Sequence, residues 1–162
     1  MLSNKIKHNS RIILIQKLFE QDFFSGTQAN EAIKSYSEAT LKELSDIQYI
    51  DQEYVLTILD EIKNNQVKID ELILKLAPEW PINNIAKIDL EILRIAILEG
   101  FIIKITPEKV AINEAIELSK EFSNDQTRKF VSGVLGNLFT NQEKYLWSTR
   151  PTNWKFPNWN KS

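Results

Sequence analysis

Apolar residues recur at steps of three and four along most of this chain, and that spacing restricts its fold more than any other feature. A half-buried strand would need strict alternation of apolar and polar residues, and no segment alternates cleanly. Only four glycines interrupt the 162 residues. The sequence therefore predicts an all-α fold, a compact bundle of about six to seven helices.

Breakers and caps divide the chain into expected helices. Ser25-Gly26-Thr27 ends the first, and Asn64-Asn65 is expected to interrupt another. Pro78 and Pro81, on either side of Trp80, predict a hinge between two halves. Thr106-Pro107-Glu108 supplies a capping hydroxyl, a first-turn proline and a first-turn acid, which predicts a helix start. The expected helices cover about residues 4–24, 31–44, 49–62, 69–76, 85–101, 107–122 and 125–138.

Small residues predict two close helix contacts. Ala111, Ala115 and Ser119 share the apolar face of one helix, so a neighbour can approach it closely. Gly133 and Gly136 offer the same in the last helix. Their spacing also resembles a GxxG nucleic-acid loop, but apolar residues fill the positions between them, so helix packing is the favoured interpretation.

Composition excludes several classes of protein. The chain has no cysteine and one histidine, which rules out disulfides, thiolate zinc sites and multi-histidine metal sites. No apolar run approaches the roughly 20 residues that span a bilayer. We therefore expect a cytoplasmic protein that binds no metal and spans no membrane. The net charge is −2, with basic ends around an acidic middle, so charge alone does not indicate nucleic acid.

No catalytic constellation stands out. His8 has no evident serine or aspartate partner, and the carboxylates of Glu114 and Glu117, one helical turn apart, are more typical of a solvated face than of an acid/base pair. No phosphate-binding glycine loop occurs. We expect a protein that is not an enzyme and needs no cofactor.

Two basic clusters are candidates for nucleic-acid contacts. The first helix carries Lys5, Lys7, His8 and Arg11 close together. Arg128-Lys129-Phe130 begins the last main helix, where a partly exposed phenylalanine beside cations can stack on an unpaired base. Phe130 is equally well explained as a residue at the edge of the core.

The last 22 residues, 141–162, form a separate aromatic and basic tail after residues 1–140. Trp147, Trp154 and Trp159 are interleaved with Arg150 and Lys155. Aromatic side chains among cations suit stacking on single-stranded nucleic acid. A tail folded back onto the domain, with its indoles in grooves, is the favoured explanation.

Three motifs resemble the NusB family of bacterial transcription antitermination factors. They are "KIDLEILRIAILEG", "TPEKVAINEAIELSKEF" and "RKFVSGVLGNL", in that order, with a weaker match at "RIILIQKLFEQDF". The resemblance implies two packed helical subdomains and no enzymatic activity. It also implies binding of boxA RNA together with NusE, a small-subunit ribosomal protein, and action with other Nus factors on the RNA polymerase elongation complex at ribosomal RNA operons.

The resemblance also implies roles for particular residues. The family's RNA contacts map onto Lys7, His8 and Arg11 in the first helix and onto Lys129 and Phe130 in the last main helix. Phe19 takes the place of a family tyrosine. Lys5 and Arg128 extend the two basic clusters. The acid before the "LRIA"-like motif, Asp89, maps onto the surface that faces NusE. Family members occur as monomers and dimers, so a homodimer stays open.

The N-terminal cluster departs from the family pattern. The family's arginines are thinned to "NKIKHNSR", and fewer phosphate contacts predict weaker, less salt-dependent RNA binding. An alternative function is therefore an interaction adaptor of the same fold with weakened or lost RNA binding. The NusB-like domain of a ribosomal RNA methyltransferase ranks last, because no cysteine is available for that chemistry.

Overall fold

The computed structural model describes residues 2–24 and 47–146, and in this part of the chain every regular element is a helix. The elements in order are α1 (Leu2–Phe24), α3 (Gln52–Leu76), the 3₁₀ turn η1 (Ile82–Asn84), α4 (Lys87–Ile97), the π-helical turn η2 (Leu98–Ile102), α5 (Glu108–Phe122), α6 (Asp125–Thr140) and α7 (Gln142–Leu146). The all-α prediction is confirmed. The helix expected over 31–44 and the three tail tryptophans lie outside the described residues.

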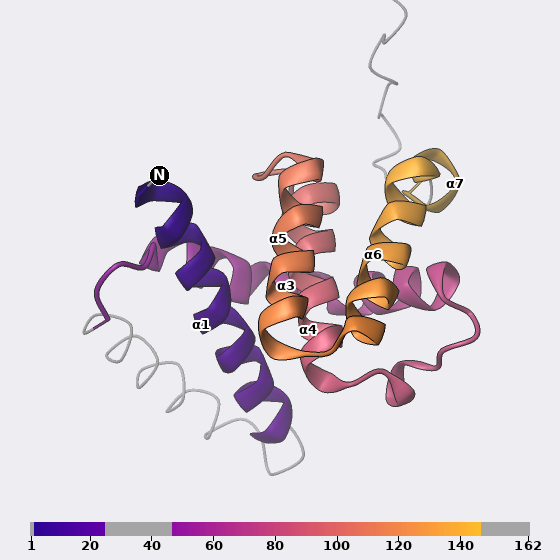
Figure 1. Ribbon diagram of the computed structural model, residues 1–162, viewed down its shortest axis with the longest axis horizontal. Helices are drawn as coiled ribbons and strands as arrows, with labels where there is room; N and C mark the ends of the chain where they lie inside the picture. The colour runs from indigo at the N-terminus through magenta and orange to yellow at the C-terminus, as the bar shows by residue number, and fades with distance from the viewer. Residues whose placement is uncertain (1, 25–46, 147–162) are drawn as a thin grey trace, which may run out of the picture.

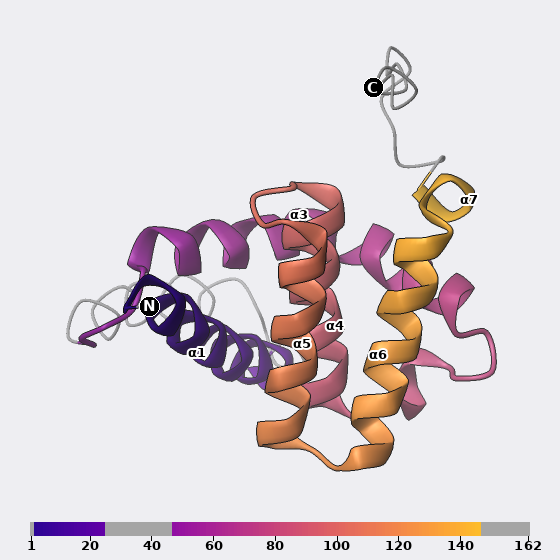
Figure 2. The same cartoon turned by 45° about the horizontal axis from the view of Figure 1, so that its top comes forward.

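The helices pack around one group. α4, α5 and α6 lie side by side, and α1 packs at one end of this group (Figures 1 and 2). α3 passes behind them, contacting α1 near one end and η1 and α7 near the other. α5 and α6 form a helical hairpin, joined by the turn at Ser123 and Asn124. This arrangement brings the start of α6 next to the loop between α3 and α4.

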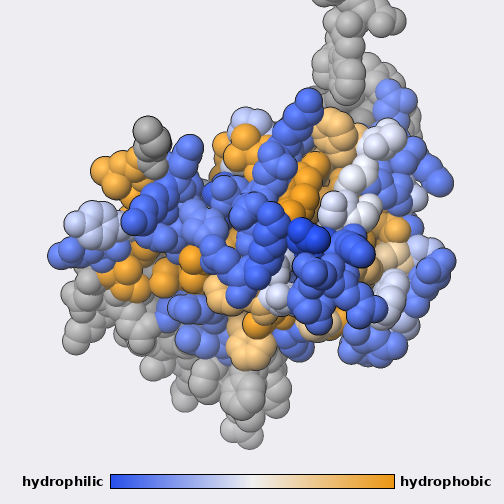
Figure 3. Space-filling model, viewed as in Figure 1, coloured by the Kyte–Doolittle hydropathy of each residue, from blue (hydrophilic) through white to orange (hydrophobic). Residues whose placement is uncertain are grey.

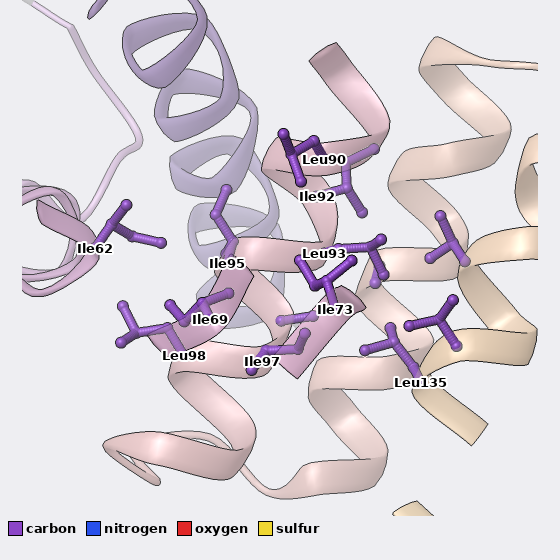
Figure 4. Packing of buried hydrophobic residues seen from close by; sticks show 14 of the residues in the cluster. Ile62, Ile69, Ile73, Leu90, Ile92, Leu93, Ile95, Ile97, Leu98 and Leu135 are labelled. Carbon is purple, nitrogen blue, oxygen red and sulfur yellow. The ribbon is translucent and has the colours of Figure 1, made fainter. Parts of the chain in front are cut away.

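One contiguous apolar cluster holds these helices together. Side chains from α3, α4 and α6 meet at its centre, among them Ile69, Ile73, Leu93, Ile97 and Leu135 (Figure 4). Leu14, Ile15 and Leu18 of α1 join the same cluster. The periodic stripes of the sequence therefore became the core as expected, because each amphipathic helix buries its apolar face.

α3 is continuous through Asn64 and Asn65, so the predicted interruption is wrong. The amide of Asn65 donates to the Glu61 carbonyl oxygen at 2.8 Å and to Glu61 Oε2 at 3.1 Å. That side chain bonds the preceding turn instead of diverting its own backbone. Buried residues on both sides of the pair, Ile62 and Ile69, keep the helix against the core.

The π-helical turn η2, which follows α4, packs closely against the start of α5. A Cβ placed on Gly100 would lie 2.9 Å from Ala111 Cβ, so glycine is required at this approach. α5 begins at Glu108 with Pro107 at its cap and no side-chain capping bond. The expected capping by Thr106 is therefore wrong: its hydroxyl lies 3.5 Å from Glu99 Oε2 instead.

Gly133 and Gly136 do not mediate close packing. Within 4 Å, a Cβ added at either position of α6 would meet no atom of residues 2–24 and 47–146 other than those of its own stretch of helix. The prediction of a close helix contact here is wrong, because the contact face of α6 is the stripe of Val131, Val134 and Leu135. The two glycines lie off that stripe.

Candidate nucleic-acid interface

The predicted contact residues fall into two regions of the fold. Lys5, Lys7, His8 and Arg11, the α1 cations, lie on the N-terminal half of α1. Arg128, Lys129 and Phe130 lie in the first two turns of α6. The two regions differ in what surrounds their charges.

Lys7 is held by the start of α3. Its Nζ lies 2.7 Å from Asp51 Oδ2 and 4.2 Å from the centre of the Tyr54 ring. Asp51 also caps α3, because its Oδ1 accepts the backbone N–H of Tyr54 at 3.0 Å. The bond from Lys7, followed by that backbone bond, lowers the pKa of Asp51. Lys7 thus joins α1 to α3.

His8 lies between two carboxylates of α5. Nδ1 is 3.1 Å from Glu114 Oε2, and Nε2 is 2.8 Å from Glu121 Oε1. Only a protonated imidazolium donates to both acids at once. Burial lowers the pKa of His8, but bonds to Glu114 and Glu121 and their charges outweigh burial and raise it. His8 therefore acts as a cation that joins α1 to α5.

Arg11 is buried and belongs to the interior. Its side chain is 4% exposed, with Nε 2.9 Å from Glu99 Oε1 and Nη1 3.5 Å from Glu114 Oε2. The Tyr54 hydroxyl donates to the same Glu99 carboxylate, and burial together with the Glu99 charge raises the pKa of Tyr54. Arg11 is the counter-ion of an acid that η2 places inside the fold. The prediction of an RNA-facing Arg11 is corrected accordingly.

Lys5 and Phe19 are the exposed members of the predicted set on α1. Lys5 is exposed, and it makes no ion pair with any residue in 2–24 or 47–146. Phe19 is 44% exposed. Eight residues separate Phe19 from Arg11, about 12 Å along the helix. The structure does not bring Phe19 into a cluster with the α1 cations.

A hollow of about 340 Å³ opens beside the α1 cations. Its lining residues come from α1, α3, α5 and the turn before α5: Asn4, Lys7, Arg11, Tyr54, Ile105, Thr106, Pro107, Val110 and Glu114. Both of its cations are already paired with acids. On this side, hydrophilic side chains alternate with hydrophobic ones (Figure 3), and the exposed Ile105 and Val110 make part of the hollow apolar. The hollow therefore has a mixed polar and apolar lining, and its positive charge is largely neutralised.

The start of α6 leaves its cations facing solvent. Asn124 caps the helix by accepting the Thr127 backbone N–H at 2.9 Å. Lys129 is exposed, and Arg128 is paired only loosely, at 3.5 Å, with an Asp125 carboxylate that is itself 88% exposed. Phe130 is half-buried and packs on the core with one side. Both interpretations of Phe130, core edge and contact surface, are compatible with this position.

Trp80 adds an aromatic residue that the sequence analysis missed as a site. Its ring centre lies 5.7 Å from that of Phe130, with 59° between the ring planes. It stays 47% exposed. The signal in the sequence was a tryptophan between two prolines at the hinge, but nothing in the sequence placed it beside a residue 50 positions later. We call Trp80, Arg128, Lys129 and Phe130 the α6 corner.

Asp89 does not face a protein partner. It is 5% exposed, at the start of α4 and against the turn that begins α6. Burial raises its pKa, and the nearby Ser123 and Thr127 oppose this rise. Its Oδ1 is buried and has no hydrogen-bond partner among the described residues. The prediction of a partner-facing Asp89 is corrected, because that turn covers its side chain.

The described residues hold no group of three or more histidine, cysteine, aspartate or glutamate side chains suited to a metal ion. None of the helices in 2–24 or 47–146 is long and apolar enough to cross a membrane. Glu114 and Glu117 do not form an acid/base pair, since Glu114 binds His8 while Glu117 binds Lys120 at 3.1 Å.

Comparison with known proteins identifies one family. The model of the NusB family matches residues 8–140. The transcription antitermination protein NusB of Clostridium novyi is 36% identical over 132 residues, which is 82% of this chain and 96% of that protein. That of Lactiplantibacillus plantarum is 48% identical over 90 residues, 55% of this chain and 65% of that protein.

Solved structures agree with this match. NusB of T. maritima has a TM-score of 0.66 at 25% identity, over 83% of this chain and 90% of that one. A crystal structure of the antitermination factors NusB and NusE in complex with dsRNA contains a chain with a TM-score of 0.63 at 21% identity, over 82% of this chain and 95% of that one. This second likeness shows the shared fold.

Proposed function

The chain belongs to the NusB family, and we propose that it acts as a transcription antitermination factor that binds boxA-type RNA chiefly through the α6 corner. The observation that carries this assignment of the surface is the exposed Lys129, which directly precedes Phe130 in the chain, together with the packing of the Phe130 ring against that of Trp80. Its role is that of a binding protein without enzymatic activity or cofactor, working in the cytoplasm.

The α6 corner suits a single-stranded RNA. Unpaired bases can stack on aromatic side chains, whereas paired bases are stacked on one another already. Cations beside the rings bind the phosphates that flank a stacked base. The N-terminus of α6 adds a favourable helix dipole for a phosphate at the same corner.

NusE is the proposed protein partner, and the pair acts within the RNA polymerase elongation complex with other Nus factors. A structure of NusB and NusE with RNA supports this choice of partner. Coupling between the two ligands is reciprocal, so NusE that tightens RNA binding must itself bind more tightly when RNA is present. The buried Asp89 directs the search for the NusE surface to exposed residues elsewhere.

A second function, an interaction adaptor with lost RNA binding, is favoured by the α1 cations. Lys7, His8 and Arg11 are all bound to carboxylates of other elements. An RNA phosphate would have to displace an existing partner to bind any of them. In that function, the protein binds NusE without selecting an RNA sequence. Self-association into a homodimer would be a further way to cover an RNA surface.

Fluorescence anisotropy separates the two functions. A short boxA-type RNA is titrated with the protein, with and without NusE, at several salt concentrations, beside a scrambled RNA of equal length. Antitermination predicts that NusE tightens binding of the boxA-type RNA selectively. Equal, non-specific binding of both RNAs in every mixture, together with measurable NusE binding, supports the adaptor and contradicts our proposal.

A further inference from the structure

We propose that Trp80, together with Phe130, forms the platform on which one unpaired RNA base stacks, so that the loop between α3 and α4 is part of the RNA-binding surface. This inference rests on the proposed function and adds a residue and a second segment of the chain to its site. The proposed ligand of the α6 corner is RNA. Docking of a protein at this corner is the alternative result that the test can detect.

Exposure is the first support. Trp80 remains 47% exposed even though it packs against Phe130. A tryptophan that served only the core would bury more of its indole, since large aromatic side chains gain most from burial. The rings lie at 59°, so neither covers the face of the other completely. Aromatic surface is therefore left for a third ring.

The loop holds Trp80 in place before any ligand binds. Pro81 follows it directly, and the Trp80 backbone N–H donates to the Ala77 carbonyl oxygen at 3.0 Å. Beyond it, η1 is closed by the Asn84 N–H on the Pro81 carbonyl oxygen at 2.8 Å. Buried Ile85 then fixes the end of the loop to the core. A preformed platform loses little conformational entropy when a ligand binds.

The charged residues next to the aromatic platform indicate which kind of ligand it binds. Lys129 is exposed next to Phe130 in the chain, and Arg128 lies one residue earlier with its side chain 35% exposed. An aromatic platform flanked by cations at a helix N-terminus matches a base and its phosphate. A docking site for an apolar protein surface would lack charges at its centre, where interfaces are depleted of them. The combination therefore favours RNA.

The test asks whether the Trp80 side chain contacts one particular base of the RNA. The full-length protein and its Trp80→Leu variant are titrated with a boxA-type RNA and with versions that carry a single abasic nucleotide at each position in turn, in the presence of NusE. Leucine keeps an apolar cover over Phe130 but offers no aromatic face. Loss of one stacked base weakens binding about 5- to 150-fold.

The expected result has a specific pattern. Trp80→Leu weakens binding of the intact RNA within that range, and one abasic position weakens wild-type binding but no longer affects the variant. Trp80→Phe, which keeps a ring, retains the sensitivity at that position. Phe139→Leu is the matched control, because Phe139 is an exposed aromatic (37%) near the opposite end of α6; it leaves the whole abasic profile unchanged.

Three results overturn the inference in distinguishable ways. If the wild-type protein with NusE binds no boxA-type RNA selectively, the proposed function fails and the platform with it. If wild-type binding is selective but Trp80→Leu weakens all RNAs by one common factor, or none, then only the platform is wrong. If Trp80→Leu instead weakens NusE binding measured without RNA, and its abasic profile matches the wild type, the corner docks a protein. Far-ultraviolet circular dichroism melts confirm that each variant is folded.

Discussion

The N-terminal half of α1 and the start of α6 carry similar charges in the sequence but have opposite surroundings in the fold. On α1, Lys7, His8 and Arg11 each contact a carboxylate of another element, and Arg11 is buried. On α6, Lys129 is exposed and directly precedes Phe130, whose ring packs against that of Trp80. One cluster therefore holds helices together, while the other remains available to a ligand.

This difference shows what a basic cluster can and cannot indicate. A cation binds nucleic acid only when its charge is not already neutralised by the protein itself. The acids that neutralise Lys7, His8 and Arg11 are Asp51, Glu99, Glu114 and Glu121, and each lies 44 or more positions from its cation in the chain. Local sequence therefore could not separate the structural cluster from the free one.

Removing the Arg11 charge should have the largest effect of the changes considered. Arg11→Met leaves the Glu99 carboxylate, 1% exposed, without its cation, and breaking a buried pair in this way costs about 3–5 kcal/mol. Urea denaturation should therefore show a large fall in the free energy of unfolding. Lys5→Met makes the same chemical change at an exposed site and should alter stability by less than about 0.5 kcal/mol.

A double variant tests whether the loss comes from the unpaired acid. Adding Glu99→Leu to Arg11→Met removes the buried charge that was left behind, so the double variant should be less destabilised than the sum of the two single variants. If Arg11→Met instead keeps wild-type stability and loses RNA binding, Arg11 is a ligand-binding residue and the contrast between the two clusters collapses.

Lys129→Gln should have a smaller effect, on RNA binding and not on stability. Losing one phosphate contact to single-stranded RNA lowers the slope of log affinity against log salt concentration by about 0.7. Lys7→Gln is the matched control on α1: because Lys7 is held by Asp51, we expect its slope to equal that of the wild type. A larger change of slope for Lys7→Gln than for Lys129→Gln would reverse the assignment of the two regions.

Most of the fold was predictable because it depends on local pattern. Stripes such as Val131, Val134 and Leu135 identify a buried helix face from spacing alone, and all of them are buried. The errors came from tertiary context. Asn65 reads as a breaker, but its amide bonds the preceding turn, and the core on both sides keeps α3 whole.

The site was less predictable because it depends on which distant residues meet. Phe130 and Lys129 were found from a local signal and from the family motif. Trp80 was not, since only the packing of the α3–α4 loop against α6 makes it part of the corner. Asp89 was assigned to a partner-facing surface from the family resemblance alone, whereas the fold leaves it only 5% exposed.

Gly133→Ala tests the α6 side of the comparison with a smaller change. Glycine inside a helix costs about 0.5–1 kcal/mol relative to alanine, and an added methyl group would meet no atom of the described residues outside its own stretch of helix within 4 Å. The variant should be more stable than the wild type by that amount in urea denaturation. Gly100→Ala is the contrasting control, because its Cβ would lie 2.9 Å from that of Ala111, and it should be destabilised.

The smallest expected effect is the pH dependence that His8 gives to stability. The pKa of His8 is raised above its ordinary value of 6.5 in the folded protein, because the bonds to Glu114 and Glu121 outweigh its burial. A raised pKa means that the folded state binds the proton more tightly than the unfolded state. The stabilisation is therefore complete below pH 6.5 and is lost as the pH rises through the folded pKa. Partly exposed ion pairs of this kind contribute less than about 1 kcal/mol.

His8→Gln isolates this contribution, since glutamine can still hydrogen-bond one carboxylate but does not titrate. The difference in unfolding free energy between wild type and variant, measured by urea denaturation over a pH series, should be greatest at and below pH 6.5 and shrink above it. A difference that stays constant or grows as the pH rises would mean that His8 is not held as a cation. In that event His8 would not be engaged by acids as a cation, and the contrast with the α6 corner would rest on Lys7 and Arg11 alone.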